Sequence, residues 1–473
     1  MDEVVIVGAG PVGLMLACEL GLAGVRPIVL EKRPEQGDLP KANGLGGQIV
    51  QFMDYRGLLE RLSEGSSFAG RPPGFPFGSV PLSFAGLDDP PLRVVLIQQP
   101  RLERLLAERA VELGAEIRRG RELLGLSQDE EGVTLDLSGE RLRARYVVGC
   151  DGARSLVREQ AGISFPGTTD DEVLRLGHFT TPDLKGPFEQ YEHLGLRQGW
   201  NRTPRGRLLV TSLQPGVHIV GVRERGQEPE GPVTLADFEA AVHRVLGSGL
   251  PLGEPVWLSS TVSQARLASR YREGRVFLAG DAAHLFPAGG SALNVGLTDA
   301  ANLGWKLAAV LAGRMPYDLL DTYDAERRLA GAHTLAHTRA QAALEGLTGE
   351  NGDALRELLT ELFAYEGPAR HLGQLLQGSD IRYGAAAGHA LVGRFAPDLP
   401  LTTAAGPTRV AELMRGGRPV LLDLGGGGLK GAGWVDVVRA HTDDPPADAL
   451  LIRPDGYIAW AGAGDLPEVW LAS

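Results

Sequence analysis

Three glycines near the start of the chain have the spacing of a turn that binds a dinucleotide. Gly8, Gly10 and Gly13 stand between an apolar, β-branched run at 3–7 and an apolar stretch at 14–22. In a strand–turn–helix unit, the first glycine permits the tight turn, the second lets the backbone approach a pyrophosphate, and the third lets the helix lie close to the strand. The N–H groups at the start of the helix also attract phosphate. The pattern therefore predicts one dinucleotide site.

Acidic residues stand at the ends of three apolar runs that are typical of buried strands. They are Glu31 after 27–30, Asp151 after 146–149 and Asp281 after 275–279. Ligands of open α/β sheets bind at the carboxyl ends of the strands, so we expect Glu31 to accept ribose hydroxyls. A glycine-rich loop after Asp281 leads into an expected helix at 291–311. The N–H groups at the start of that helix are suited to stabilise negative charge on a ligand.

The composition indicates a globular chain of two or three domains that does not bind nucleic acid. The chain has 473 residues, of which 43% are hydrophobic, and this is enough for packed cores despite 65 glycines and 31 prolines. Its formal charge is −12, from 59 acidic and 47 basic residues, which argues against a nucleic-acid partner. The only cysteines, Cys18 and Cys150, exclude a disulfide scaffold and a cysteine-rich metal site.

The apolar segment at 4–25 is not expected to be a signal peptide or a membrane span. Asp2 and Glu3 precede it where a signal peptide carries positive charge, and Pro11 and several glycines interrupt it. We therefore expect a cytoplasmic protein that does not enter a membrane.

Two histidines have a spacing that metal sites use, but the surrounding sequence does not favour a metal site. His333 and His337 are four residues apart on an expected helix, a spacing that zinc sites use. No glutamate follows His333, however, and no third ligand is evident. We expect a solvated helix face and no metal.

Three motifs together resemble the class A FAD-dependent aromatic hydroxylases. They are the dinucleotide turn, Asp-Gly-x-x-Ser-x-Val-Arg at 151–158 and Gly-Asp-Ala-Ala-His at 280–284, in that order. The chain is similar, over nearly its whole length, to the branch that acts on aromatic polyketides and antibiotics, such as aklavinone and angucycline hydroxylases and rifampicin monooxygenase. The resemblance implies an α/β fold. Its parts are a Rossmann-like FAD-binding domain, an antiparallel-sheet substrate domain and a C-terminal thioredoxin-like domain.

The same resemblance implies where the domains begin and end. The FAD-binding domain is expected to be discontinuous, at 1–175 and 270–394, with the substrate-binding sheet at 176–269. The C-terminal domain is expected at 395–473. It contains no cysteine, so thiol–disulfide chemistry is excluded there. A structural role is the default expectation for it, and a part in oligomerisation stays open, including a homodimer.

Cofactor-binding residues follow from the family motifs. Gln99 is expected beside the flavin, the backbone of Leu123 at the adenine, and Asp281 at the ribityl chain or ribose hydroxyls. The backbone N–H groups of Leu293 and Asn294 are expected at the isoalloxazine. The complete expected set is Gly8, Gly10, Val12, Gly13, Glu31, Lys32, Lys41, Gln99, Leu123, Asp151, Ser155, Asp281, Gly289, Gly290, Leu293 and Asn294. In such families the motif at Asp151 serves both the flavin and the nicotinamide cofactor.

The sequence departs from the family pattern at two places near the expected flavin. The residues 289–292 read Gly-Gly-Ser-Ala where the family has Gly-Gly-Gln-Gly, and the preceding loop is one residue shorter. Lys41 replaces the usual arginine, which keeps the positive charge but loses the planar fork.

Substrate-pocket residues are harder to derive. Aromatic and histidine side chains of the expected sheet compete with an interpretation as ordinary strand packing, which is the more frequent case. The candidates are His178, Tyr191, Trp200 and His218, together with Pro287 and Ala288 in the glycine-rich loop.

The function implied by the resemblance is an FAD- and NAD(P)H-dependent monooxygenase. It would use O2 to hydroxylate a polycyclic aromatic polyketide through a flavin C4a-hydroperoxide, and NADPH or NADH would be the reductant. Because the flavin performs the chemistry, no side chain is assigned as catalytic. Two alternatives stay open: Baeyer–Villiger oxygenation of a similar substrate, and a flavoprotein that sequesters an aromatic drug without turnover.

Overall fold

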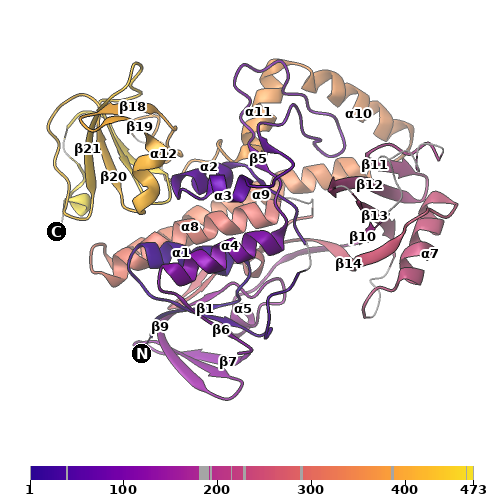
Figure 1. The fold of residues 1–473 in the computed structure, drawn as a ribbon, viewed down its shortest axis with the longest axis horizontal. Coiled ribbons are helices and arrows are strands. Elements are labelled where there is room, and N and C mark those ends of the chain that lie inside the picture. Colours follow the sequence, from indigo (N-terminus) through magenta and orange to yellow (C-terminus); the bar gives the residue numbers. More distant parts are fainter. Residues whose placement is uncertain are drawn as a thin grey trace.

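The computed structural model contains three β-sheet units connected by long helices (Figure 1). It describes residues 2–38, 41–180, 191, 194–214, 216–226, 231–287, 291–384, 388–464 and 466–471. The mixed α/β class expected from the sequence is confirmed.

The first sheet is largely parallel and contains the dinucleotide turn. Its parallel part has the order β16-β9-β1-β2-β6, and β15 and the antiparallel pair β7–β8 extend it. The strands are β1 (Asp2–Val7), β2 (Ile28–Glu31), β6 (Glu116–Arg119), β7 (Leu123–Gln128), β8 (Val133–Leu137), β9 (Arg141–Gly149), β15 (Arg272–Glu273) and β16 (Val276–Leu278). The buried face of β1 and the apolar helices beside it form the largest core. Glu31 ends β2, and Asp151 and Asp281 follow β9 and β16, so all three lie at the carboxyl ends of parallel strands in one sheet.

Long helices cover this sheet and position its loops. α1 (Pro11–Leu22) begins at the dinucleotide turn and packs against α8 (Ser291–Leu311) and α4 (Gln99–Glu112). α9 (Asp321–Gly346) follows α8 and runs toward the second sheet (Figure 1). Shorter helices are α2 (Gln48–Tyr55), α3 (Leu59–Ser63) and α5 (Leu156–Gln160), and a small sheet joins β3 (Leu45–Gly46), β5 (Val94–Val95) and β4 (Ala69–Gly70).

The second sheet is antiparallel and carries a helix on its outer face. Its order is β11-β12-β13-β10-β14-β17, and α7 (Leu235–Leu246) packs on it through Phe238, Ala241 and Val245. The strands are β10 (Gly167–Thr180), β11 (Gly199–Thr203), β12 (Gly206–Gln214), β13 (Val217–Arg225), β14 (Glu254–Leu267) and β17 (His284–Leu285). β10 begins before residue 176, so the exact domain boundaries stay a prediction.

The C-terminal unit contains a third sheet and is reached through two helices that sequence analysis did not foresee. These are α10 (Gly349–Phe363) and α11 (Glu366–Gln377). The sheet has the order β19-β18-β21-β20-β22-β23 and one parallel pair, β20 with β21. Its elements are β18 (Pro400–Thr403), β19 (Gly406–Arg409), α12 (Val410–Leu413), β20 (Val420–Asp423), β21 (Asp436–His441), β22 (Ala449–Ile452) and β23 (Ile458–Ala461).

Buried charges join the C-terminal unit to the first. Glu326 on α9 accepts hydrogen bonds from both terminal nitrogens of Arg453, each at 2.7 Å, and from the ammonium of Lys306 at 2.8 Å. Asn302 on α8 donates to Glu326 at 2.7 Å and to Asp455 at 2.9 Å. Burial lowers the pKa of Lys306 to about 8, against the attraction of Glu326. These side chains are satisfied only when both units are in place.

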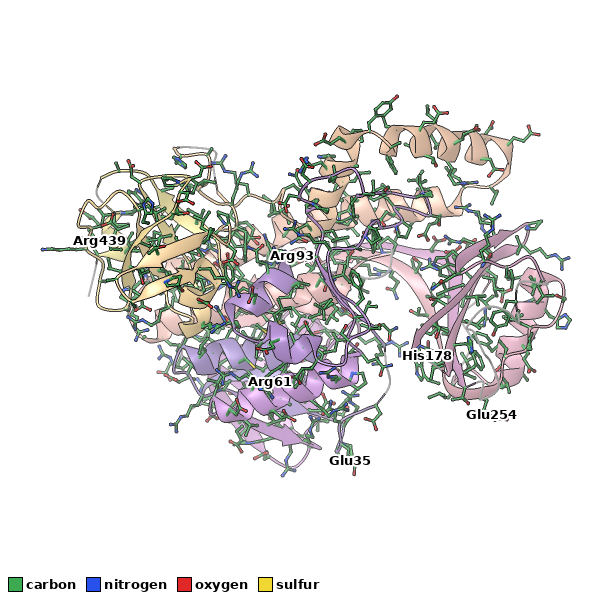
Figure 2. The ribbon with its side chains drawn as sticks, turned by 45° about the horizontal axis from the view of Figure 1, so that its top comes forward. Glu35, Arg61, Arg93, His178, Glu254 and Arg439 are labelled. Atoms are coloured by element: carbon green, nitrogen blue, oxygen red, sulfur yellow. The ribbon has the colours of Figure 1, made fainter. Side chains whose placement is uncertain are left out.

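Arg453→Met is expected to lower the free energy of unfolding by about 3–5 kcal/mol, because it leaves buried carboxylates without their main partner. A urea titration measures the loss. The matched control is Arg439→Met, on the outer surface of the same sheet (Figure 2), where the pair with Asp423 is long at 3.7 Å. We expect a change below about 1 kcal/mol for the control. Equal losses for the two variants would show that the buried cluster does not hold the units together.

Candidate active site

A cavity of about 730 Å³ begins at the dinucleotide turn and reaches α9 and α11. This volume is in the range of sites for cofactors and drug-sized ligands, on the order of 300–1,000 Å³. Its wall brings together residues that are far apart in sequence. At the end near the turn these are Gly10, Val12, Lys41, Gln99, Gly152, Asp281, Leu293 and Asn294.

The three glycines of the turn have the distinct roles that their spacing predicts. Gly8 has a φ of +109°, and a Cβ there would lie 2.4 Å from the carbonyl oxygen of Cys150. A Cβ on Gly13 would lie 2.0 Å from the carbonyl oxygen of Gly8, so α1 can approach β1 only with glycine at this position. Gly10 differs, since a Cβ there would meet no atom within 4 Å. The space beside Gly10 is open to a ligand.

Glu31 lies buried at the end of β2 and is held by nitrogen donors. Its carboxylate accepts the backbone N–H of Ala9 at 3.1 Å and both the backbone N–H and the side chain of Arg33. Burial on its own raises the pKa of Glu31, but these hydrogen bonds outweigh it and lower the pKa overall. The residue is therefore an ionised acceptor at neutral pH.

Asp151 and Ser155 build the loop between β9 and α5. Asp151 Oδ2 accepts the N–H of Val157 at 3.1 Å, while its Oδ1 is buried without a partner among the described residues. Burial raises the pKa of Asp151. Ser155 is the N-cap of α5 and accepts the N–H of Arg158 at 2.9 Å. The loop is thus fixed by its own hydrogen bonds, and one carboxylate oxygen is left for another donor.

Asp281 faces the cavity from a short 3-10 turn after β16. Its side chain is accessible from the cavity, although the cavity wall itself lies deep in the protein. Burial raises the pKa of Asp281, and the charges of His284 and Lys41 act in the opposite direction. This is the geometry expected of a carboxylate that receives ligand hydroxyls.

A fully buried ion cluster beneath this turn was not foreseen. Asp299 on α8 accepts the N–H of Gly280 at 3.0 Å, Nε2–H of His284 at 2.8 Å and Nε–H of Arg327 at 2.7 Å. Burial on its own raises the pKa of Asp299, but Arg327 and His284 lower it overall. The cluster fixes the turn that carries Asp281. The only sequence signal for it is an acid inside an otherwise apolar helix.

The start of α8 lies at the cavity as expected. Leu293 and Asn294 line the wall, and Asn294 Oδ1 accepts the N–H of Gly46 at 3.0 Å. Gln99 also lines the wall, at the start of α4, and donates to Glu103 at 2.8 Å. Ala288, Gly289 and Gly290 lie outside the described residues.

Seven of the fourteen expected cofactor residues that the structure describes do not line the wall of this cavity: Gly8, Gly13, Glu31, Lys32, Leu123, Asp151 and Ser155. Lys32 is exposed beyond β2, and Leu123 is buried in β7, where it pairs with Leu137. Their roles at the adenosine stay a prediction.

None of the expected substrate residues lines the described cavity wall. His178 is buried against Trp257, with ring centroids 5.1 Å apart, and Figure 2 shows it within the second sheet. Tyr191 packs against His218 at 6.1 Å. Trp200 lies below the guanidinium of Arg223, at 5.4 Å. Pro287 accepts the hydroxyl of Ser263 at 3.3 Å. Strand packing accounts for these contacts, and a role in a pocket stays a prediction.

The histidine pair on α9 does not lie on a solvated helix face, and that expectation is wrong. His333 and His337 are half-buried and both line the cavity. His333 donates to Asp380 at 3.0 Å, an acid near the end of α11 that sequence spacing could not connect with it. Within the described ranges, no group of three or more metal-ligating side chains is present.

Comparison with known proteins decides the family. The FAD binding domain model matches residues 1–338, and the C-terminal model of aromatic-ring hydroxylases matches 389–471. The chain belongs to the FAD-dependent aromatic-ring hydroxylases. It is thus a flavin-dependent monooxygenase by family, as the three motifs indicated.

Similar proteins place it in the antibiotic branch of these hydroxylases. A rifampicin monooxygenase of Streptomyces venezuelae is 42% identical, with 98% of this chain and 96% of that protein covered. A 12-dehydrotetracycline 5-monooxygenase/anhydrotetracycline 6-monooxygenase of Streptomyces rimosus is 41% identical, with 98% and 95% covered. The solved Diels-Alderase PyrE3 of pyrroindomycin biosynthesis has a TM-score of 0.88 and 38% identity, with both chains covered completely. None of the helices in the described ranges is long and apolar enough to cross a membrane.

Gly10→Ala is expected to reduce the FAD that copurifies with this hydroxylase at least about tenfold without disturbing the fold. The added methyl group meets no protein atom, and the φ of −78° at Gly10 suits any residue, so the only space it fills is that of the ligand. The ratio of flavin to protein absorbance measures retention, and far-UV circular dichroism monitors the fold. Gly13→Ala is the contrasting variant, because its methyl group clashes with Gly8 and should unfold the chain. Normal FAD content in Gly10→Ala would place the pyrophosphate elsewhere.

Proposed function

We propose that this protein is an NAD(P)H-dependent flavin monooxygenase that hydroxylates a polycyclic aromatic compound in the cavity. The observation that carries the proposal is the continuity of that cavity, which connects the dinucleotide turn to a chamber bounded by α9 and α11. A cofactor and a planar substrate can therefore lie end to end in one continuous cavity. The substrate class follows from the names of the antibiotic-modifying relatives.

The residues present fit FAD. Gly10 leaves room for a pyrophosphate, Asp281 presents a carboxylate to ribityl or ribose hydroxyls, and the helix α8 points its N-terminus at the flavin end. Among the described wall residues, Asn43 keeps a buried side-chain oxygen without a hydrogen-bond partner. A donor from the cofactor would satisfy it. We assign the other expected cofactor residues, among them Val12, Leu293 and Asn294, to the same cofactor.

When bound, FAD accepts a hydride from NAD(P)H and activates O2 for transfer of one oxygen atom to the ring. The chain supplies the surroundings for this chemistry. N–H groups at the start of α8, near Leu293 and Asn294, would stabilise negative charge on a reduced flavin bound at this end of the cavity. Lys41 adds a positive charge at the same wall. Both effects favour the reduced, anionic cofactor.

The chamber beyond the flavin end is suited to limit the access of water to the reacting atoms once a ligand fills it. Its described wall is mainly apolar. Polar side chains lie along α9, and Gln377 at the end of α11 adds one more. The apolar residues are Phe75, Leu92, Val94, Leu96, Leu375, Leu376 and Ile381. Such walls suit a flat aromatic ligand and protect a reactive oxygen species from unproductive decay.

A second pocket, of about 450 Å³, is suited to the phosphates of NAD(P)H. It lies on the Asp151–Ser155 loop and is lined by Arg154, Arg158 and Arg266. Guanidinium groups bind phosphate in a bidentate manner. The position agrees with the double role that the family gives to this loop.

Arg154→Met is expected to raise the KM for NADPH about tenfold with little change in FAD content, because an exposed phosphate-binding cation is lost while the loop keeps its own hydrogen bonds. Stopped-flow measurement of flavin reduction against NADPH concentration tests this. Arg141→Met removes an equally exposed arginine outside the pocket and should leave the KM unchanged. An unchanged KM in Arg154→Met would contradict docking at this pocket.

Turnover itself is tested with polycyclic phenols and ansamycins under ¹⁸O2. We expect at least one of them to accelerate NADPH oxidation by the purified yellow protein at least about tenfold and to gain a single labelled oxygen as a phenolic hydroxyl. Mass spectrometry and NMR of the product measure the outcome. A labelled lactone would replace hydroxylation by Baeyer–Villiger oxygenation. Substrate binding with no NADPH consumption would favour sequestration.

A second candidate function is cycloaddition without net oxidation. It is supported by the resemblance to PyrE3, whose name describes a Diels-Alderase and which shares the complete fold. Such an activity would use the same enclosed chamber to orient an unsaturated chain. It would give an isomeric product without labelled oxygen, which the same experiment distinguishes.

A further inference from the structure

One face of α9 supplies the polar side of the chamber. Ala330, Thr334, His337 and Gln341 recur every three or four residues and all line the cavity, so they form one continuous stripe. The opposite walls, formed by Phe75 and the leucines of α11, offer no hydrogen bonds from their side chains. A ligand in this chamber therefore finds side-chain hydrogen-bond partners along α9. Gln377, at the end of α11, also lines the wall, but its Oε1 already accepts the N–H of Arg93 at 3.0 Å.

Within this stripe, His337 is held in one tautomer. Its Nδ1 lies 3.1 Å from Nε2 of Gln341, an amide nitrogen that can only donate. Nδ1 must then be the acceptor, and the proton of the neutral ring resides on Nε2. Burial, together with the nearby His333, lowers the pKa of His337 to about 4, so the ring is neutral at physiological pH.

The neighbouring histidine, His333, already has an acceptor for its ring proton. His333 donates its Nε2 proton to Asp380 at 3.0 Å, so that proton is already used. The two rings lie edge to face, with centroids 6.0 Å apart. Within the described residues, Nε2 of His337 has no such acceptor. His337 is half-buried on the cavity wall, so a ligand that fills the chamber would displace water from this N–H and must offer it an acceptor in exchange.

We propose that His337 donates the hydrogen bond from Nε2 to a carbonyl oxygen on the ring edge of the aromatic substrate. This inference rests on the proposed function and narrows its substrate class. The substrate is then a planar polycyclic compound that carries a quinone or ketone oxygen on the edge facing α9. Gln341 acts through His337 and is a positioning residue.

The test compares two tricyclic phenols that differ only in quinone oxygens, 1-hydroxyanthraquinone and 1-hydroxyanthracene. Binding to the FAD-loaded protein is measured from the perturbation of the flavin absorbance spectrum. We expect the wild-type protein to bind the quinone more tightly. His337→Leu should weaken quinone binding about tenfold and leave 1-hydroxyanthracene within about twofold, because only the quinone carries a carbonyl acceptor for this hydrogen bond. His337→Gln retains an N–H donor and should restore most of the difference.

His371→Leu is the matched control, since this histidine is exposed on α11 and does not line the cavity. It should change neither affinity. Equal weakening of both probes by His337→Leu, or no change for either, would overturn the proposal, because each outcome shows that no quinone-specific hydrogen bond exists. NADPH oxidation followed in the same samples keeps the two proposals separate. The expected binding pattern without turnover would support the hydrogen bond and contradict the monooxygenase, whereas turnover without the pattern would do the reverse.

Discussion

The structure depends on one buried carboxylate that receives hydrogen bonds from three residues in two other parts of the chain. Asp299 is fully buried and would be strongly destabilising without partners. It therefore requires Gly280 and His284 from the loop after β16 and Arg327 from α9 to take fixed positions. The loop that presents Asp281 to the cavity and the helix that forms the chamber wall are thus held by the same acid. The cofactor end and the substrate end of the cavity therefore have a defined relative position, because the charge of Asp299 must be neutralised by both segments.

The same principle continues into the C-terminal unit. Arg327 also donates to the hydroxyl of Tyr383, whose ring stacks on Tyr457 at 4.2 Å. Next to this pair, Arg453 is bound to Glu326 and Asp455. Each cation in the series is buried and each has an acidic partner from another segment. Breaking any one pair leaves an unpaired charge in the buried interior. We therefore expect all of these pairs to break together when the C-terminal unit separates from the first unit.

Sequence reasoning predicted what is local and missed what is brought together by folding. The turn that begins at Gly8 and the helix Ser291–Leu311 follow from residue types at short spacing. That helix has the expected limits, whereas the helix after the turn begins at Pro11, three residues before the expected stretch at 14–22. The orientation of β13 could not be predicted, because the strand is buried on both faces and shows no alternation. His333 was misjudged for a different reason. Its partner Asp380 is 47 positions away, across two helices that no sequence pattern had indicated.

The C-terminal unit contributes to the site as well as to stability. Tyr457, which precedes β23, lines the cavity and donates its hydroxyl hydrogen bond to Oε1 of Gln48 at 2.7 Å. Gln48 is the first residue of α2. It stands two residues after Gly46 of β3, whose N–H donates to Oδ1 of Asn294. A domain without redox cysteines therefore completes the wall opposite the start of α8. A purely structural role would not require a side chain at this place, so in this chain the cavity wall is incomplete without the C-terminal unit.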